Sequence, residues 1–405
     1  MTRSRFSAWC APVSAALLFS FAACATPVPV GAPAPDRMPP ERGSPAGAAT
    51  RRSPVGPAPL SPALAAQSGV VRWPIKTAEH IDLWLHAFAM ISSDSVPMPL
   101  YRRGYRDSMT VVKNRAGLFT SLDSNRTVLG KQLRTSNGYV LAQFLTLDVA
   151  NWDVLRAFGE RFLQAGGDVR RASDKGTAER LAPFAAIFPT PEDREWLRLF
   201  LAGVDDEQRR FFATEHSRIV RTRAAVITAV DSLWQRVYRP KFDRFLTNTG
   251  QRTGDIVLSV PVGGEGRTGL GRDRQTVVVV PFPQRVEDAA DVLLVFAHEI
   301  TGPLVASVVA DNTTPAEQRA GAADRVLSVG QVRAGAMLLA RIAPELTAPY
   351  MRFYLAHVGA LEAGAARDAS ASETALTLQF AQRFPLPDTI RGALERQIEI
   401  VLGGI

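Results

Sequence analysis

The sequence predicts an α+β protein in which helices dominate and a small antiparallel sheet interrupts them. Apolar residues recur at helical spacing from about residue 73 to residue 247. Two short β-branched runs, 255–262 and 275–282, then flank a glycine-rich stretch. Helical periodicity returns from residue 286 onward. Runs of helices on both sides of a short strand-rich segment are typical of the α+β class.

Residues 1–23 have the pattern of an export signal. Arg3 and Arg5 form a basic start, and the apolar core behind them is shorter than the roughly 20 residues of a membrane-spanning helix. The core ends in Phe-Ala-Ala-Cys, which resembles a bacterial lipobox and implies lipidation at Cys24. This reading predicts a protein anchored to the bacterial cell envelope through a lipid on Cys24. Plain cleavage after a small-residue site, which leaves a soluble secreted protein, is the alternative.

Residues 24–68 consist largely of Pro, Ala and Gly and show no apolar period. Such a composition predicts a disordered tether, made semi-rigid by its prolines. The only cysteines are Cys10 and Cys24. The part of the chain beyond the tether therefore has no disulfide and no catalytic cysteine, and its stability must come from its core.

A mainly helical domain is expected over residues 69–250. In the segment 80–91 the apolar residues fall on one helical face. Asn151 or Asp153, and the Thr-Pro-Glu-Asp sequence that starts at Thr190, supply the chemistry of helix starts.

The formal net charge is +8, from 47 basic and 39 acidic residues. The arginines are scattered, and no basic run interleaved with aromatic residues marks a nucleic-acid site. The charge therefore predicts no nucleic-acid partner.

The second domain, 251–405, is expected to begin with a β-hairpin made of the two β-branched runs. Gly264, Gly266 and Gly269 between them match the spacing of a dinucleotide fingerprint. That fingerprint needs a helix directly afterwards, so that the helix N-terminus meets the pyrophosphate. Here another strand follows, which indicates a flexible loop between strands.

His298 and Glu299 lie in the apolar helical stretch VLLVFAHEITGPLV, about 20 residues after the second run. Together they form the first half of an HExxH motif, in which two His one turn apart bind zinc and the Glu activates a metal-bound water. An apolar stripe marks one face of this helix: Leu293, Phe296, Ala297, Ile300 and Leu304.

From residue 255 to about residue 360 the chain resembles the zincin metallopeptidases, in particular the branch that uses a Glu ligand. In that family an edge strand that pairs with an extended peptide precedes the motif helix, and a later helix supplies the third zinc ligand. The resemblance implies His298 as a zinc ligand, Glu299 as the general base, and a peptide or protein as substrate. Glu345 and Glu362 are the acids considered for the third ligand, and His357 is a further imidazole.

The chain departs from the motif where the second His belongs. That position is Gly302, which has no side chain, and Pro303 follows it. Proline crowds the carbonyl four residues before it, so the helix should kink or end there. Two hypotheses stay open: a cell-envelope zinc metallopeptidase with an altered site, or a non-catalytic tethered protein that keeps a zincin-like scaffold for binding.

Two further groups of residues could have a functional or a purely structural role. His80 and His86 are six residues apart, so one helix would point them in different directions, which disfavours a metal pair. The proline-bounded stretch 94–107 concentrates Tyr and Arg, as recognition surfaces do. A structural loop that caps the domain is the competing interpretation.

Overall fold

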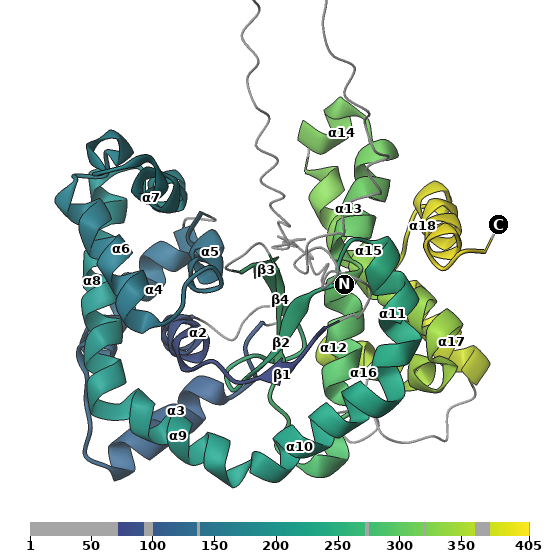
Figure 1. Cartoon of the computed structure of the whole chain (residues 1–405), viewed down its shortest axis with the longest axis horizontal. Helices are drawn as coiled ribbons and strands as arrows, with labels where there is room; N and C mark the ends of the chain where they lie inside the picture. The colour runs from purple at the N-terminus through teal and green to yellow at the C-terminus, as the bar shows by residue number, and fades with distance from the viewer. Residues whose placement is uncertain are drawn as a thin grey trace, which may run out of the picture. The chain divides into compact units, whose positions relative to one another are not determined.

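A four-stranded mixed sheet lies among the helices of the folded part of the chain (Figure 1). The computed structural model describes residues 72–92, 100–135, 138–271, 275–319, 321–360 and 373–404. Helices make up 72% of these residues, which confirms the predominantly helical α+β class. The expected leader and tether, and Cys24 with its expected lipid, lie outside the described residues.

The strands do not pair as the sequence suggested. Their bounds are β1 (Ile75–Lys76), β2 (Gly254–Ser259), β3 (Arg267–Leu270) and β4 (Thr276–Pro281), in the spatial order β1-β2-β4-β3. β2 and β4, expected as the two arms of a hairpin, are parallel neighbours, and β3 runs antiparallel to β4 at the edge. The sheet is therefore mixed rather than antiparallel. The glycine-rich segment supplies a strand of its own, so the chain reverses twice between β2 and β4.

Both faces of the sheet are covered, which explains the uninterrupted valines of β4. Successive side chains of a strand point to opposite faces. One set packs with residues of helix α2 (Glu79–Ile91): Val257, Val277 and Val279. The other set belongs to the core that contains helix α12 (Asp291–Ile300): Ile256, Leu258, Val278 and Val280.

The helices between β1 and β2 are coloured purple to teal in Figure 1. After α2 they are α3 (Tyr105–Arg115), α4 (Ser121–Thr135), α5 (Gly138–Leu141), α6 (Trp152–Gln164), α7 (Lys175–Ile187), α8 (Pro191–Glu207), α9 (Ala213–Thr222), α10 (Ala224–Leu233) and α11 (Arg239–Asn248). Two 3-10 segments, η1 (Ala142–Thr146) and η2 (Val169–Arg171), and two π-helical turns, η3 (Gln208–Phe212) and η4 (Trp234–Tyr238), lie among them.

Two expected helix starts are confirmed. The side chain of Asn151 accepts the N–H of Val154 at 3.0 Å at the start of α6. Thr190 and Asp193 form a reciprocal capping box at the start of α8, where Pro191 is the first residue. These contacts satisfy amide groups that the first turn of a helix leaves unpaired.

The helices after β4 are coloured green to yellow in Figure 1. After the 3-10 turn η6 (Val286–Asp288) and α12 they are α13 (Gly302–Asp311), α14 (Pro315–Arg319), α15 (Ala322–Ile342), the 3-10 turn η7 (Pro344–Leu346), α16 (Thr347–His357), α17 (Glu373–Arg383) and α18 (Asp388–Val401).

The segment Val286–Asp311 is long and apolar enough to cross a membrane when judged by length and composition alone. In the fold, 83% of its most apolar window is buried inside the protein. Burial in the core therefore accounts for its composition, since a helix that is apolar all round is what a large core requires.

The boundary expected near residue 250 follows the end of α11, but the residues on its two sides share a sheet and a core. Across it, β1 pairs with β2 in parallel register. The indole N–H of Trp73 donates to the carbonyl of Gln251 at 2.9 Å, and that of Trp234 donates to the carbonyl of Trp73 at 2.7 Å. Residues 71–405 accordingly belong to one compact unit.

Candidate functional site

Helix α12 holds His298 and Glu299 in its last turn, inside the core. Every residue from Val292 to Ile300 is buried, which includes the expected apolar stripe as far as this helix extends. His298 is 2% exposed and Glu299 is 6% exposed. Sheet residues pack on one side of α12, and residues of α15 and α16 belong to the same core. Both polar side chains are therefore enclosed by packed residues and largely removed from bulk water.

The helix ends directly after this pair, as the proline predicted. α12 stops before Thr301, and α13 begins at Gly302 with Pro303 in its first turn. The hydroxyl of Thr301 donates to the carbonyl of His298 at 2.8 Å. Pro303 has no amide hydrogen to offer the carbonyl of Glu299, so the regular ladder of hydrogen bonds stops here. The expected interruption of the motif helix is confirmed.

Both carboxylate oxygens of Glu299 accept hydrogen bonds. Nδ1 of His298 lies 3.0 Å from Oε1, and the hydroxyl of Thr268 donates to Oε2 at 2.7 Å. An ionised carboxylate can only accept, so the proton of the first contact is on Nδ1. The imidazole also stacks on Tyr354 of α16, with ring centroids 5.3 Å apart and an interplanar angle of 27°.

Thr268 reaches Glu299 because of the register of β3. It is paired with Val278, whose side chain belongs to the core on the α12 face of the sheet. Residues paired across two strands point to the same face, so the hydroxyl of Thr268 also points toward α12. The preceding residue, Arg267, points to the other face, where its Nε donates to Gln143 of η1 at 3.2 Å.

The charge state of Glu299 follows from these contacts. Burial alone would raise its pKa, but the hydrogen bonds from His298 and Thr268 and the charge of Arg267 outweigh burial and hold the pKa below its usual value. Glu299 is therefore ionised at neutral pH. The same hydrogen bonds and charges that favour the ionised carboxylate make Glu299 a weaker base than an ordinary Glu.

The place of the missing second His is filled by another helix. A Cβ added to Gly302 would lie 2.6 Å from Nε2 of Gln331, which belongs to α15. Contacts that short do not occur, so any side chain at Gly302 requires Gln331 to move. An imidazole at this position would need a larger displacement still.

Glu345, the acid chosen for the third ligand, faces another partner. It lies in η7 and forms an ion pair with Lys241 of α11. Its side chain is 47% exposed, whereas that of His298 is 3% exposed. The hydrogen bond from Lys241 also lowers the pKa of Glu345. The structure does not bring Glu345 and His298 together in one environment.

His357 is half-buried at the end of α16 and donates from Nδ1 to the carbonyl of Phe353 at 2.8 Å. Burial lowers the pKa of His357, which favours its neutral form. Its ring lies against the glycine-rich loop, because a Cβ on Gly264 would come within 2.0 Å of it. Glu362 lies outside the described residues.

The described side chains do not fit the zinc site that the resemblance implies. Catalytic zinc needs three protein ligands and an open fourth position. Within the described residues no three His, Cys, Asp or Glu side chains are grouped for a metal ion. The glycine at position 302 and the pairing of Glu345 with Lys241 account for two of the missing ligands.

The glycine-rich loop, expected to be flexible, is instead packed against the site. An added Cβ on Gly266 would lie 2.7 Å from Cγ of Glu299 and 2.7 Å from the carbonyl oxygen of Val279. One on Gly269 would meet Leu147 at 2.6 Å. Glycine is therefore needed at both positions, because the backbone there lies too close to neighbouring residues for a side chain to fit. Their spacing was visible in the sequence, but the surfaces that they approach were not.

Replacing Gly266 with alanine should destabilise the protein by about 1–3 kcal/mol, because the new methyl group meets both Glu299 and a backbone carbonyl that cannot give way. Chemical denaturation measures the effect. Gly392 in α18 is the matched control, because a Cβ there meets only the end of Arg396 at 3.5 Å. Gly392→Ala should be neutral or stabilising by up to about 1 kcal/mol. If the two variants are equally stable, the close packing of the loop is wrong.

A second polar cluster, which the sequence did not reveal, lies in the helical half. Glu207 lies at the end of α8. Each of its carboxylate oxygens accepts a hydrogen bond from Nζ of Lys113 of α3, at 2.9 Å for Oε1 and 2.7 Å for Oε2. Nε2 of His86 lies 3.0 Å from Oε1 of the same carboxylate, and Nδ1 lies 2.9 Å from the hydroxyl of Tyr105. Thr120 donates to it as well. All five side chains are buried.

Asp82 of α2 extends this polar arrangement toward the sheet. Its carboxylate accepts the N–H of Val260, directly after β2, and pairs with Nε2 of His216 of α9 at 3.2 Å. The polar face of α2 is thus structural, because it ties α3, α8 and α9 to the end of a strand. Of the expected recognition stretch 94–107, residues 94–99 lie outside the described residues; in the described part, Tyr105 opens α3 and contacts His86.

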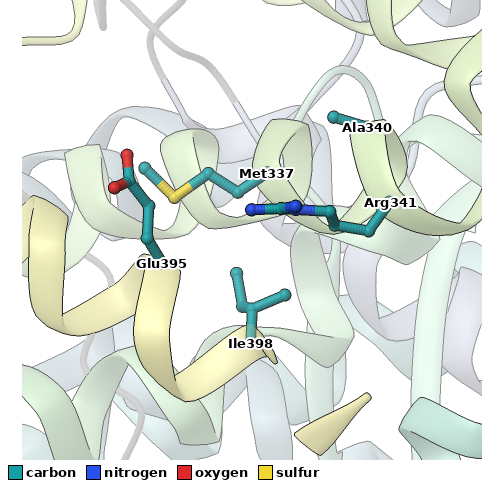
Figure 2. Close-up of a pocket in the computed structure, with 5 residues that line it drawn as sticks. All are labelled: Met337, Ala340, Arg341, Glu395 and Ile398. Atoms are coloured by element: carbon teal, nitrogen blue, oxygen red, sulfur yellow. The ribbon is translucent and has the colours of Figure 1, made fainter. Parts of the chain in front are cut away.

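A hollow of about 350 Å³ lies between α15 and α18 (Figure 2). Met337, Ala340 and Arg341 line it from α15, and Glu395 and Ile398 line it from α18. No residue of the His298–Glu299 cluster lines it.

Comparison with known protein families, curated proteins and solved structures finds no match for this chain.

Proposed function

We propose that this chain is a tethered protein of the bacterial cell envelope whose zincin-like core serves for binding or scaffolding and does not hydrolyse peptides. The expected export signal, the lipid anchor at Cys24 and the proline-rich tether place the folded unit near a membrane surface. The expected ligand is a peptide or protein.

One observation carries the non-catalytic part of the proposal. Glu299, the residue that would act as the general base, already accepts hydrogen bonds from His298 and Thr268 in a buried position. A general base must reach the proton that it removes, either directly or through one water. Here one acceptor position on each carboxylate oxygen is used within the protein, the side chain is only 6% exposed, and Gln331 faces the position of the second ligand.

The purified protein should therefore hold far less than one zinc per chain, and its melting temperature should change by less than about 1 °C when EDTA is added. A metal that binds only the native state stabilises it, so a filled zinc site would shift the melting temperature by several degrees. Metal analysis and thermal unfolding with and without chelator measure both quantities. One zinc per chain, a chelator-sensitive melting temperature and casein hydrolysis that Glu299→Gln abolishes would together contradict the proposal.

Two variants test the zincin-like geometry itself. Gly302→His alone should gain little zinc affinity, because Gln331 stands in the way. Gly302→His combined with Gln331→Ala removes that obstacle but still lacks a third ligand, so it should bind zinc only weakly, with a melting temperature that rises on addition of zinc and falls again with chelator. Gln331→Ala alone is the control. If the double variant gains no zinc dependence, the resemblance to zincins is at fault, whereas the absence of catalysis in the native chain is unaffected.

A metallopeptidase with an altered site is the second candidate function. The observation that favours it is the place of β3, an antiparallel edge strand whose Thr268 contacts Glu299. An edge strand beside the motif helix is the arrangement expected for peptide binding by strand addition. The strand expected in this role, residues 275–282, is interior as β4, and β3 occupies the edge instead.

A further inference from the structure

Two arginines converge just beyond the carboxyl ends of the parallel strands β2 and β4. Nη2 of Arg102, in the segment before α3, donates to the carbonyl oxygen of Phe282 at 2.9 Å. Nη1 of Arg223, between α9 and α10, donates to the same oxygen at 3.2 Å. Phe282 directly follows β4, and the backbone N–H of Arg102 donates to Pro261 after β2 at 2.8 Å.

Among the residues that the structure describes, this pair has no carboxylate in ion-pair contact, although the charge of Asp82 raises the pKa of both arginines. Within the described residues, no Asp or Glu oxygen lies within 4.0 Å of either guanidinium. The two acids that lie in the same region are already engaged: Asp82 accepts from Val260 and pairs with His216, and Glu215 pairs with Arg218 at 2.6 Å. Two positive charges thus share one carbonyl oxygen.

Both guanidinium groups keep donors available. Each carries five N–H groups in a planar fork, and the shared carbonyl takes one from each. The side chains are half-buried, and none of their nitrogens is both buried and without a hydrogen-bond partner. The nitrogens that make no bond within the protein therefore face solvent. Arg223 is also held in orientation by the ring of Phe282, 5.2 Å below its guanidinium carbon.

Holding these two charges together is unfavourable, and the charge of Asp82, which makes no ion-pair contact with either arginine, offsets it only in part. Burial lowers the pKa of Arg223 to about 10, and the neighbouring charges of Arg102 and Arg218 act in the same direction. A carbonyl oxygen needs only one such donor, so satisfying Phe282 does not explain why two guanidinium groups are brought there. The carboxyl ends of parallel strands are also where open α/β sheets bind their ligands.

We propose that Arg102 and Arg223 form a binding site for a compact oxyanion, either a carboxylate or a phosphate group of a ligand. The planar fork of arginine matches both groups, because each presents two oxygens at the spacing of two N–H donors. The site is separate from His298 and Glu299 and goes beyond the proposed function, so neither proposal depends on the other.

Thermal unfolding of the full chain at pH 7 tests the site, with 0–20 mM sodium phosphate, sodium acetate or sodium chloride at constant ionic strength. In phosphate or acetate the melting temperature should rise by about 2–4 °C above the chloride value, because the anion binds the folded state. Arg223→Gln and Arg102→Gln should each lose this rise. Arg221→Gln is the matched control, because it removes the same charge from an exposed position two residues away, and it should keep the rise.

The outcomes separate the two kinds of anion. A rise with phosphate alone assigns a phosphate ligand, and a rise with acetate alone assigns a carboxylate. Broadening of the phosphorus-31 resonance of inorganic phosphate by the native chain, lost in Arg223→Gln, gives a readout that does not depend on stability. If neither anion exceeds chloride, or if Arg223→Gln and Arg221→Gln respond alike, the site does not exist.

Discussion

Replacing Glu207 with glutamine should destabilise the protein by about 2–4 kcal/mol, because buried Lys113 and His86 lose a fully buried carboxylate and Lys113 keeps only Asp123 as an ion-pair partner. The Lys113 side chain is 2% exposed and Glu207 is fully buried. Glutamine keeps the size of the side chain but not its charge, so the loss reports electrostatics rather than a cavity. Urea denaturation followed by circular dichroism measures the change in the free energy of unfolding.

Glu195 supplies the matched control on the same helix. Its carboxylate pairs with Arg198, but both side chains are more than half exposed, at 55% and 58%. Glu195→Gln should therefore change stability by less than about 1 kcal/mol. The double variant Lys113→Met with Glu207→Leu removes both charges of the central pair but leaves Asp123 without Lys113, so it should recover only part of the loss. A loss below about 1 kcal/mol for Glu207→Gln would show that the buried network does not contribute as described.

The carboxylate of Glu207 also makes the stability of the protein depend on pH in the acid range. Burial alone would raise the pKa of Glu207, but the hydrogen bonds and charges of His86 and Lys113 outweigh it and lower the pKa to about 2. A group with a depressed folded-state pKa stabilises the protein above its ordinary pKa and loses that contribution as the pH falls. Stability should thus decline from about pH 4.5 toward pH 2, and Glu207→Gln should flatten this decline.

The second large effect is expected at Phe296, two residues before the His–Glu pair. Phe296→Ala should cost about 3–5 kcal/mol, because the ring is fully buried and its removal leaves a cavity. The ring contacts Trp73 at 5.1 Å, Trp234 at 5.0 Å and Phe242 at 5.7 Å between centroids. Phe119→Ala is the control, since that ring is 65% exposed, and it should change stability by about 0.5 kcal/mol or less.

The partners of Phe296 also predict how the protein unfolds. Trp73, Trp234 and Phe242 precede residue 250 and Phe296 follows it, so the two halves meet in one aromatic cluster. Tryptophan fluorescence and circular dichroism should therefore report one shared urea transition, and Phe296→Ala should move it as a whole. Two separate transitions, only one of which shifts in the variant, would instead support the two domains, 69–250 and 251–405, that the sequence suggested.

The helices and their ends were accessible from the sequence because their signals are local. The cap at Asn151, the capping box at Thr190 and the break at Pro303 each depend on residues within one helical turn. The burial of His298 and Glu299 also follows from the apolar residues around them. The partners of these two residues could not be predicted from local signals. Thr268 comes from a strand 31 residues earlier, and Tyr354 comes from α16, five elements after α12.

The strand order shows why such contacts need the tertiary structure. Two β-branched runs with glycines between them have the same local pattern whether they form a hairpin or lie parallel with a third strand inserted. Which of these forms is settled by packing: α2 covers one face, α12 covers the other, and β3 must place Thr268 against Glu299. Likewise His298 and Glu299 carry the half-motif in the sequence, but only the fold places Gln331 where its second half would be. Residue spacing along the chain determines where a helix forms and where it stops. The neighbours of a buried carboxylate such as Glu299 come instead from distant segments of the chain. Those neighbours decide whether the carboxylate is ionised and what it can bind.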